Sequence, residues 1–326
     1  MTTATPTTTD EQKPKSGFKI KNFWDRFGML TVFAGLFLIC CMFVPNFASM
    51  INMRGLGLAI SMSGMIACAM IFCLACGDLD LSVASIVACA GVVTAVVINS
   101  TSSVFMGVAA GLLSGVAFGL FNGFIIAKLQ VNALITTLAT MQIARGLGYI
   151  ISDGKAVGIS EEGFFALGNS SFLGLPVPVW LTIVTFVVFS FLLNKTVYGR
   201  NTLAIGGNEE AARLAGVSVT KTKLIIFTVS GLISALAGVI LAARMTSGQP
   251  MTSVGFELTV ISACVLGGVS LKGGVGKISY VVAGVLILGT VENAMNLMNI
   301  SPFAQYVVRG AILLAAVIFD RYKQAR

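Results

Sequence analysis

The chain has 326 residues, of which 56% are hydrophobic and only 10% are charged, and its mean hydropathy is +0.93. Since a soluble domain carries roughly 25% charged residues, this composition excludes a water-soluble globule and indicates a polytopic membrane protein. The formal net charge of +8 would favour nucleic-acid binding in a soluble protein. Here the basic residues lie at the ends of apolar runs, which is typical of membrane topology, so we expect contact with membrane lipid and none with nucleic acid.

The chain begins with a polar segment, residues 1–22, that is rich in Thr and Lys and lacks an apolar core. This composition is typical of a disordered tail and not of a cleaved signal peptide. The first apolar segment, residues 27–44, follows a basic flank, which predicts a cytoplasmic N-terminus. We therefore expect a membrane domain over residues 23–326.

Nine further apolar segments follow the first. They cover residues 56–76, 81–98, 104–127, 133–151, 178–193, 224–243, 258–270, 278–298 and 303–319. Threading ten spans from a cytoplasmic start places sixteen of the 21 lysines and arginines on the cytoplasmic side. The sequence thus predicts an all-α, polytopic transmembrane helical bundle of about ten spans with both termini in the cytoplasm.

Two places in this bundle are irregular. The segment 258–270 is short for a full crossing of a ~30 Å hydrocarbon core, and the connection 77–81 is too short to leave the membrane comfortably. Either is compatible with a broken or re-entrant element, which membranes tolerate where the backbone is buried in protein or lines a cavity.

A ladder of glycines marks the span 104–127. Five glycines recur at every fourth position, which places them on one helix face and lets another helix approach closely. Packing within the chain is the favoured explanation, and a seam between two copies is the alternative. The ladder consists of Gly107, Gly111, Gly115, Gly119 and Gly123.

Polar side chains at membrane depth are costly and indicate function by default. Neutral amides and hydroxyls suit a polyol, because they offer hydrogen bonds without trapping charge. For the two aspartates, helix capping or pairing with Arg145 or Arg309 is an equal alternative, and helix-to-helix hydrogen bonds explain the neutral residues equally well. The candidate substrate-pathway residues are Asp78, Asp80, Asn132, Thr136, Thr140, Gln142, Glu292, Asn293 and Asn296.

The hydrophilic loop 194–223 is predicted to be cytoplasmic and to contain a short helix over residues 206–216, which we call the knob. Asn208 can cap its N-terminus, and Gly216 can adopt the left-handed conformation at its end. Acidic residues in its first turn and Arg213 in its last turn suit the helix dipole. Its apolar side can seat in a partner's groove, although an ordinary capped loop helix explains the pattern as well. The candidate docking residues are Gly206, Asn208, Glu209, Glu210, Ala211, Ala212, Arg213, Leu214 and Gly216.

The same loop carries a longer pattern: Tyr198-Gly199-Arg200, Ala204-Ile205-Gly206-Gly207-Asn208, Ala211-Ala212-Arg213-Leu214-Ala215-Gly216-Val217 and Lys223. This pattern resembles the cytoplasmic signature of sugar permeases of the ribose/xylose/arabinose ABC importer family. A second stretch, Gly77-Asp78-Leu79-Asp80-Leu81-Ser82-Val83, resembles that family's Gly-Gly-Ile-Asp-Leu-Ser motif. It departs from the motif at two positions, with Cys76 in place of the first Gly and Leu79 in place of Ile.

The resemblance implies a transmembrane permease subunit of an ABC importer that carries a monosaccharide across the bacterial inner membrane. It implies that the loop 194–223 docks on a separate ABC-type ATPase subunit, that a periplasmic sugar-binding protein delivers the sugar, and that the permease is a homodimer. The stretches 132–158, 244–250 and 292–309 look most like the arabinose branch of the family, which implies L-arabinose as the cargo.

The alternative function is a stand-alone proton-coupled secondary sugar transporter or facilitator, with Asp78, Asp80 or Glu292 carrying the proton. An enzyme is not expected, because the chain has no histidine, the usual near-neutral general base and metal ligand. The glycines before Lys277 do not form a phosphate loop, because residue 271 is Leu and residue 278 is Ile. We expect no catalytic residue, cofactor or metal, and we expect the energy source to lie in another subunit.

Overall fold

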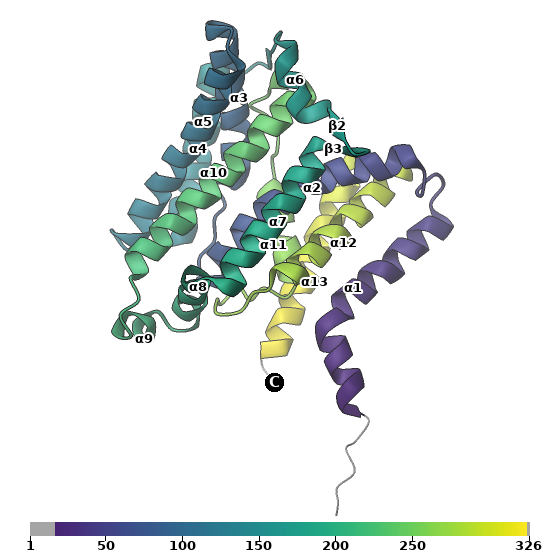
Figure 1. The fold of residues 1–326 in the computed structure, drawn as a ribbon, viewed down its shortest axis with the longest axis vertical. Coiled ribbons are helices and arrows are strands. Elements are labelled where there is room, and N and C mark those ends of the chain that lie inside the picture. The colour runs from purple at the N-terminus through teal and green to yellow at the C-terminus, as the bar shows by residue number, and fades with distance from the viewer. Residues whose placement is uncertain (1–16, 325–326) are drawn as a thin grey trace, which may run out of the picture.

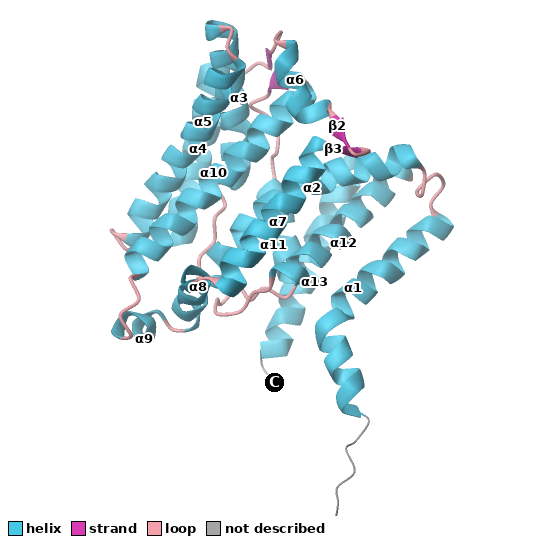
Figure 2. Ribbon diagram, viewed as in Figure 1, coloured by secondary structure: helices cyan, strands magenta, loops and turns pink. Residues whose placement is uncertain are grey.

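The computed structural model describes residues 17–324 and is built mainly of helices (Figures 1 and 2). The predicted helical class is confirmed, apart from four strands of two residues each. Strand β1 (Val157–Gly158) pairs antiparallel with β4 (Ser247–Gly248), and β2 (Ser171–Phe172) pairs with β3 (Leu175–Pro176). The helices are α1 (Gly17–Phe43), α2 (Met50–Ala75), α3 (Val83–Thr101), α4 (Val104–Ala127), α5 (Ala133–Ser152), α6 (Glu162–Asn169), α7 (Val177–Lys195), α8 (Val197–Gly207), α9 (Glu209–Leu214), α10 (Val219–Met245), α11 (Phe256–Leu266), α12 (Ile278–Leu297) and α13 (Pro302–Gln324).

Each of the ten predicted apolar segments contains a helix, although residues 81–82 and 267–270 are not helical. Within residues 17–324, seven helices are long and apolar enough to cross a membrane, namely α2, α3, α4, α5, α7, α10 and α12. Three further apolar helical stretches are shorter: Gly28–Phe43, Phe256–Leu266 and Pro302–Ile318. The fold is therefore that of a polytopic helical membrane protein, and seven of the ten predicted spans have full length.

Helices also occupy residues that were predicted as tail or that lie outside the predicted apolar segments. Helix α1 begins at Gly17, inside the predicted tail 1–22, and residues 1–16 of that tail lie outside the described part of the chain. An apolar helix can continue into such a flank because lysine is a good helix former. Residues 162–169 and 197–207 lie outside the predicted apolar segments and form α6 and α8, which are too short to stand out as apolar runs.

The two ends of the bundle are different. Helices α8 and α9, the first turns of α1 and the C-terminal end of α13 lie at one end, which we call the knob end (Figure 1). Helix α6 and the hairpin β2–β3 lie at the opposite end.

The glycine ladder of α4 packs against two helices of the same chain. An added Cβ at Gly111 would lie 3.1 Å from the Ala90 carbonyl oxygen of α3. An added Cβ at Gly115 or Gly119 would lie 2.4 Å from a backbone carbonyl oxygen of α10. The favoured explanation, packing within the chain, is confirmed, and this face is not a seam between copies.

Both places where irregularity was expected interrupt the helical pattern. Residues 77–82 connect α2 to α3 and are not helical. Asp78 contacts Lys223 of α10 and Asp80 contacts Ser230, which lies about 10 Å farther along that helix. Helix α3 therefore begins inside the bundle. Helix α11 follows a non-helical segment, 249–255, and its 11 residues span roughly 16 Å, about half of a ~30 Å hydrocarbon core.

Candidate functional site

The knob has the capped geometry that its sequence predicts. The Asn208 side chain accepts a hydrogen bond from the Ala211 backbone N–H at 2.9 Å, and Gly216 has a φ of +84°. Arg213 pairs with Glu209 at 3.1 Å and with Glu210 at 3.7 Å. The helix itself is the six-residue α9, and Gly206 belongs to the end of the preceding helix α8. These contacts make the knob a stiff, self-supporting projection.

The apolar side of the knob is divided between the bundle and the surface. Ala212 is buried in the hydrophobic core, so the prediction that it forms part of the outward apolar surface is wrong. Ala211 and Ala215 are exposed, and the Leu214 side chain is 82% exposed. Residues three and four apart share a helix face, so these three side chains form one small apolar patch. An apolar patch rimmed by charges is typical of a partner surface.

The knob is joined to the bundle by a charge cluster of Asp78, Glu209 and Lys223. The Lys223 ammonium lies 3.0 Å from the Asp78 carboxylate and 3.1 Å from the Glu209 carboxylate. Burial raises the pKa of the Asp78 carboxyl above its ordinary value, and the Lys223 ammonium opposes part of that rise. Asp78 was predicted as a pathway residue and Glu209 as a docking residue, and the structure brings the two together.

A glycine junction lies beside this cluster. An added Cβ at Gly206 would lie 1.9 Å from the Ala75 carbonyl oxygen at the end of α2, and one at Gly273 would lie 2.9 Å from the Gly77 backbone nitrogen. The Gly274 backbone N–H also donates to the Ala75 carbonyl oxygen at 2.9 Å. The ends of α8 and α2 and the loop before α12 therefore meet backbone to backbone, without room for a side chain.

Asp80 is wholly enclosed and accepts hydrogen bonds from within the chain. Its carboxylate accepts from the Ser82 backbone N–H at 3.0 Å, from the Ser82 hydroxyl, and from the Ser230 hydroxyl of α10 at 2.7 Å. The Asn122 amide of α4 donates to the Ser82 hydroxyl at 2.9 Å. Asp80 thus fixes the start of α3 against two other helices, and this arrangement favours the capping explanation for it.

The pathway candidates of α5 lie on different sides of that helix. Asn132 caps α5 by accepting from the Leu134 backbone N–H at 2.9 Å, and the Thr136 hydroxyl donates back to the Asn132 carbonyl oxygen at 3.0 Å. Thr140 is buried, whereas Gln142 is exposed in the middle of the helix. Among these candidates, Gln142 therefore presents an amide at membrane depth.

The candidates of α12 make contacts with neighbouring helices. Glu292 pairs with Arg309 of α13 at 2.7 Å. The amides of Asn293 and Asn52 of α2 exchange two hydrogen bonds of 2.8 Å. Asn296 accepts from the Gln305 amide of α13 at 2.8 Å. The structure therefore does not collect the predicted pathway residues at one site, and their role in transport stays a prediction.

Removing one partner of the Glu292–Arg309 pair is expected to destabilise the bundle. The side chains are only 26% and 32% exposed, so Arg309→Met leaves a poorly hydrated carboxylate unpaired. We expect Arg309→Met to cost about 3 kcal/mol of unfolding free energy, because an uncompensated buried charge is left behind. The measurement is thermal unfolding in detergent. The double variant Glu292→Gln/Arg309→Met should recover most of the loss, and equal instability of the single and double variants would contradict the explanation.

Arg145 has a role that sequence reasoning missed. Its guanidinium donates two hydrogen bonds of 2.7 Å, to the carbonyl oxygens of Pro250 and Thr252 in the non-helical segment before α11. The suggested pairing of the aspartates with Arg145 or Arg309 is therefore wrong, since Lys223 and serine hydroxyls occupy them. A charged residue inside a span was the available signal, but its carbonyl partners are not visible in the sequence.

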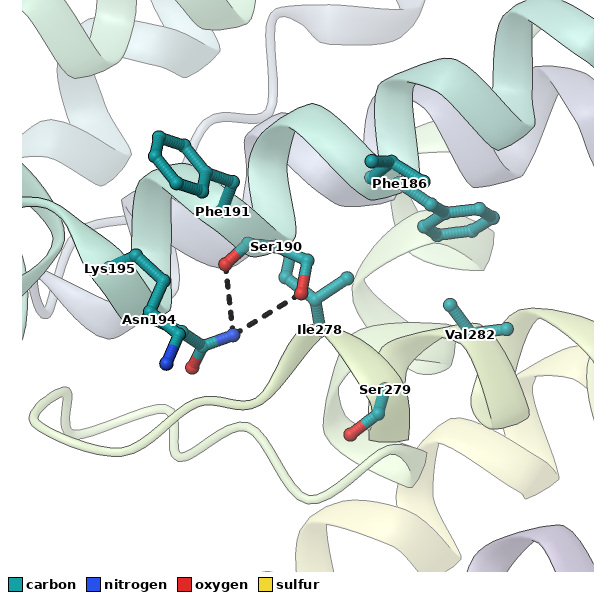
Figure 3. A pocket seen from close by; sticks show the side chains of 9 residues that line it. Phe186, Ser190, Phe191, Asn194, Lys195, Ile278, Ser279 and Val282 are labelled. Carbon is teal, nitrogen blue, oxygen red and sulfur yellow. Dashed lines mark hydrogen bonds between the residues drawn. The ribbon is translucent and has the colours of Figure 1, made fainter.

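A groove of about 490 Å³ lies between α7 and α12 near the knob end (Figure 3). Phe186, Phe191 and Val282 supply apolar walls, and Lys195 lies at one end. The Asn194 amide turns back to Ser190, donating to its carbonyl oxygen at 2.9 Å. The apolar walls fit lipid chains better than a polyol, so we do not assign this groove to sugar.

Comparison with known proteins places these features in a family. The family model described as "Branched-chain amino acid transport system / permease component" matches residues 52–317. The chain is 74% identical to the L-arabinose transport system permease protein of Escherichia coli (strain K12), over 95% of both chains. It is 55% identical to the L-arabinose ABC transporter permease protein of Azospirillum brasilense, over 92% of this chain and 88% of the relative. It is 41% identical to the ribose import permease protein of Bacillus subtilis (strain 168), over 90% and 92%. No solved structure matches the chain.

Proposed function

The chain belongs to the branched-chain amino acid transport system / permease component family, and from that membership we propose that it is the transmembrane permease subunit of an ABC importer for L-arabinose. The observation that carries the proposal is the 74% identity over 95% of both chains to a protein named as an L-arabinose transport system permease. The relatives compared above are named as transport permeases, so a transport role and not an enzymatic one is proposed.

We propose that all ten apolar segments cross or enter the bacterial inner membrane and that the knob end faces the cytoplasm. The distribution of basic residues supports this orientation, because sixteen of the 21 lysines and arginines fall on the cytoplasmic side of a ten-span topology. The first turns of α1, the C-terminal end of α13 and the knob share one end of the bundle, which is compatible with an even number of crossings (Figure 1).

The proposed partner at the knob end is an ABC-type ATPase subunit. Its groove would receive the patch of Ala211, Leu214 and Ala215, in the manner of a helix seated in a groove. ATP binding and hydrolysis would then move the knob, and the spans would rock between outward-open and inward-open arrangements.

Two further partners complete the proposed importer. A periplasmic sugar-binding protein delivers L-arabinose at the end that carries α6 and the β2–β3 hairpin. A second copy of the permease covers the outer face of α5, where Gln142 is exposed among apolar side chains such as Ile143 and Leu147. An amide that faces lipid is costly because lipid chains offer it no hydrogen-bond partner. A second copy of the permease or a water-filled pathway on this face would supply partners for the Gln142 amide.

Uptake of labelled L-arabinose into proteoliposomes tests the proposal. The vesicles hold the chain with the ATPase that copurifies from membranes, ATP is enclosed with the ATPase, and the binding protein is added outside. We expect uptake only when chain, ATPase, ATP and binding protein are all present. Uptake by the chain alone, driven by a proton gradient, would instead establish a secondary transporter.

A further inference from the structure

We infer that Lys223 couples the knob to the interrupted segment 77–82, so that movement of the knob acts on the start of α3 through two ion pairs. The inference rests on the proposed function and deepens it. It names the residues that connect the ATPase-docking surface to the membrane-embedded helices.

The charge cluster joins the consecutive helices α9 and α10 to the segment 77–82, which lies far from them in the sequence. Glu209 lies in the first turn of α9, Lys223 lies near the start of α10, and Asp78 lies in the segment between α2 and α3. The Lys223 and Asp78 side chains are only 12% and 13% exposed, whereas Glu209 is 42% exposed. The cluster therefore reaches from the surface of the knob into the interior of the bundle.

The segment is held again at its other end. Two residues beyond Asp78, the Asp80 carboxylate accepts from Ser230 of α10, and Ser82 accepts from Asn122 of α4. Asp78 is thus linked to Glu209 of the knob through Lys223 at the start of α10, whereas Asp80 is held by Ser230 farther along the same helix. A displacement of Glu209 that carries Lys223 and Asp78 with it would turn the segment about Asp80, directly before the first residue of α3.

The cluster exceeds what the stability of the knob requires. The knob already has its Asn208 cap, its Arg213 ion pairs and the buried Ala212. Enclosing charges costs desolvation energy, and an apolar contact would hold α10 against the segment at lower cost. A lysine has three donors on a flexible stem, so it can follow one carboxylate while it keeps the other. These properties suit a moving connection.

The test uses the complete importer in proteoliposomes and compares uptake with ATPase binding. We expect Lys223→Met to lower L-arabinose uptake about tenfold, the size of a typical coupling between sites, while ATPase copurification and basal ATP hydrolysis persist. Lys223→Arg keeps a cation between the carboxylates and should retain uptake within about twofold. Because Glu209 is at the surface, Glu209→Gln keeps the test decisive if Lys223→Met fails to insert.

A double-variant comparison separates coupling from independent structural effects. If one connection is involved, Asp78→Asn/Glu209→Gln should impair uptake no more than the worse single variant, because residues that share a network are not additive. Asp153→Asn is the matched control, since Asp153 is exposed at the end of α5, away from the cluster, and its φ of +50° suits asparagine, so this variant should transport normally.

Three results would overturn the inference: normal uptake by Lys223→Met, loss of ATPase copurification in that variant, or single-variant losses that multiply in the double variant. The proposed function fails in a different way, because the wild-type chain would then neither bind an ATPase nor depend on ATP. The two failures are therefore distinguishable.

Discussion

Replacing Leu214 by aspartate is expected to abolish the association of the chain with its ATPase subunit while the chain still inserts in the membrane. Leu214 is 82% exposed at the tip of a capped helix, so the substitution leaves the bundle untouched. In the complex, the loss of a buried leucine and the enclosure of an unpaired carboxylate should weaken binding by about a hundredfold or more. Copurification of the ATPase from membranes measures the effect.

The matched control for this variant is Leu173→Asp. Leu173 is 77% exposed in the turn between β2 and β3, at the end opposite the knob (Figure 1). Its φ of +50° is one that aspartate tolerates well. Leu173→Asp should bind the ATPase like the wild type. Undiminished copurification with Leu214→Asp, or equal loss in the two variants, would remove the knob as the docking surface.

The second large effect is expected inside the bundle, where Gly115→Val should prevent α4 from packing on α10. An added Cβ would lie 2.3 Å from the Ala235 Cβ and 2.4 Å from the Gly231 carbonyl oxygen, and backbone atoms cannot rotate away. Overpacking of this kind costs about 3 kcal/mol or more. We expect a large fall in the yield of monodisperse protein and in the Tm measured in detergent.

Gly35→Val provides the comparison for the ladder variant. Gly35 lies in the apolar part of α1 and has open space where a side chain would go. The same chemical change should therefore leave yield and Tm near the wild-type values. A Tm for Gly115→Val equal to that of Gly35→Val would show that the α4–α10 contact can adapt to a side chain.

Local patterns explain which features the sequence predicted. The length of an apolar run is a local property, so the helices of all ten apolar segments were predicted. The caps at Asn208 and Gly216 depend on neighbouring residues, so they were found as well. Helices α6 and α8 were missed because they are short, with eight and 11 residues, and lack a long apolar run.

Contacts between distant segments explain what the sequence did not predict. Asp78 and Lys223 each stood out in the sequence, but no local pattern shows that they pair. The burial of Ala212 likewise depends on how the knob rests on the bundle, which its helical periodicity does not show. The separate contacts of Glu292, Asn293 and Asn296 depend on the arrangement of α2, α12 and α13.

The glycine junction has a consequence for how such importers diversify. Gly206 packs against the backbone at the end of α2, whereas Leu214, eight positions later, is exposed. Residues on the exposed side of the knob can therefore be substituted without disturbing the membrane domain. Adaptation to a different ATPase subunit during evolution then requires substitutions at only a few exposed positions of the knob, while the glycine junction beneath them stays unchanged.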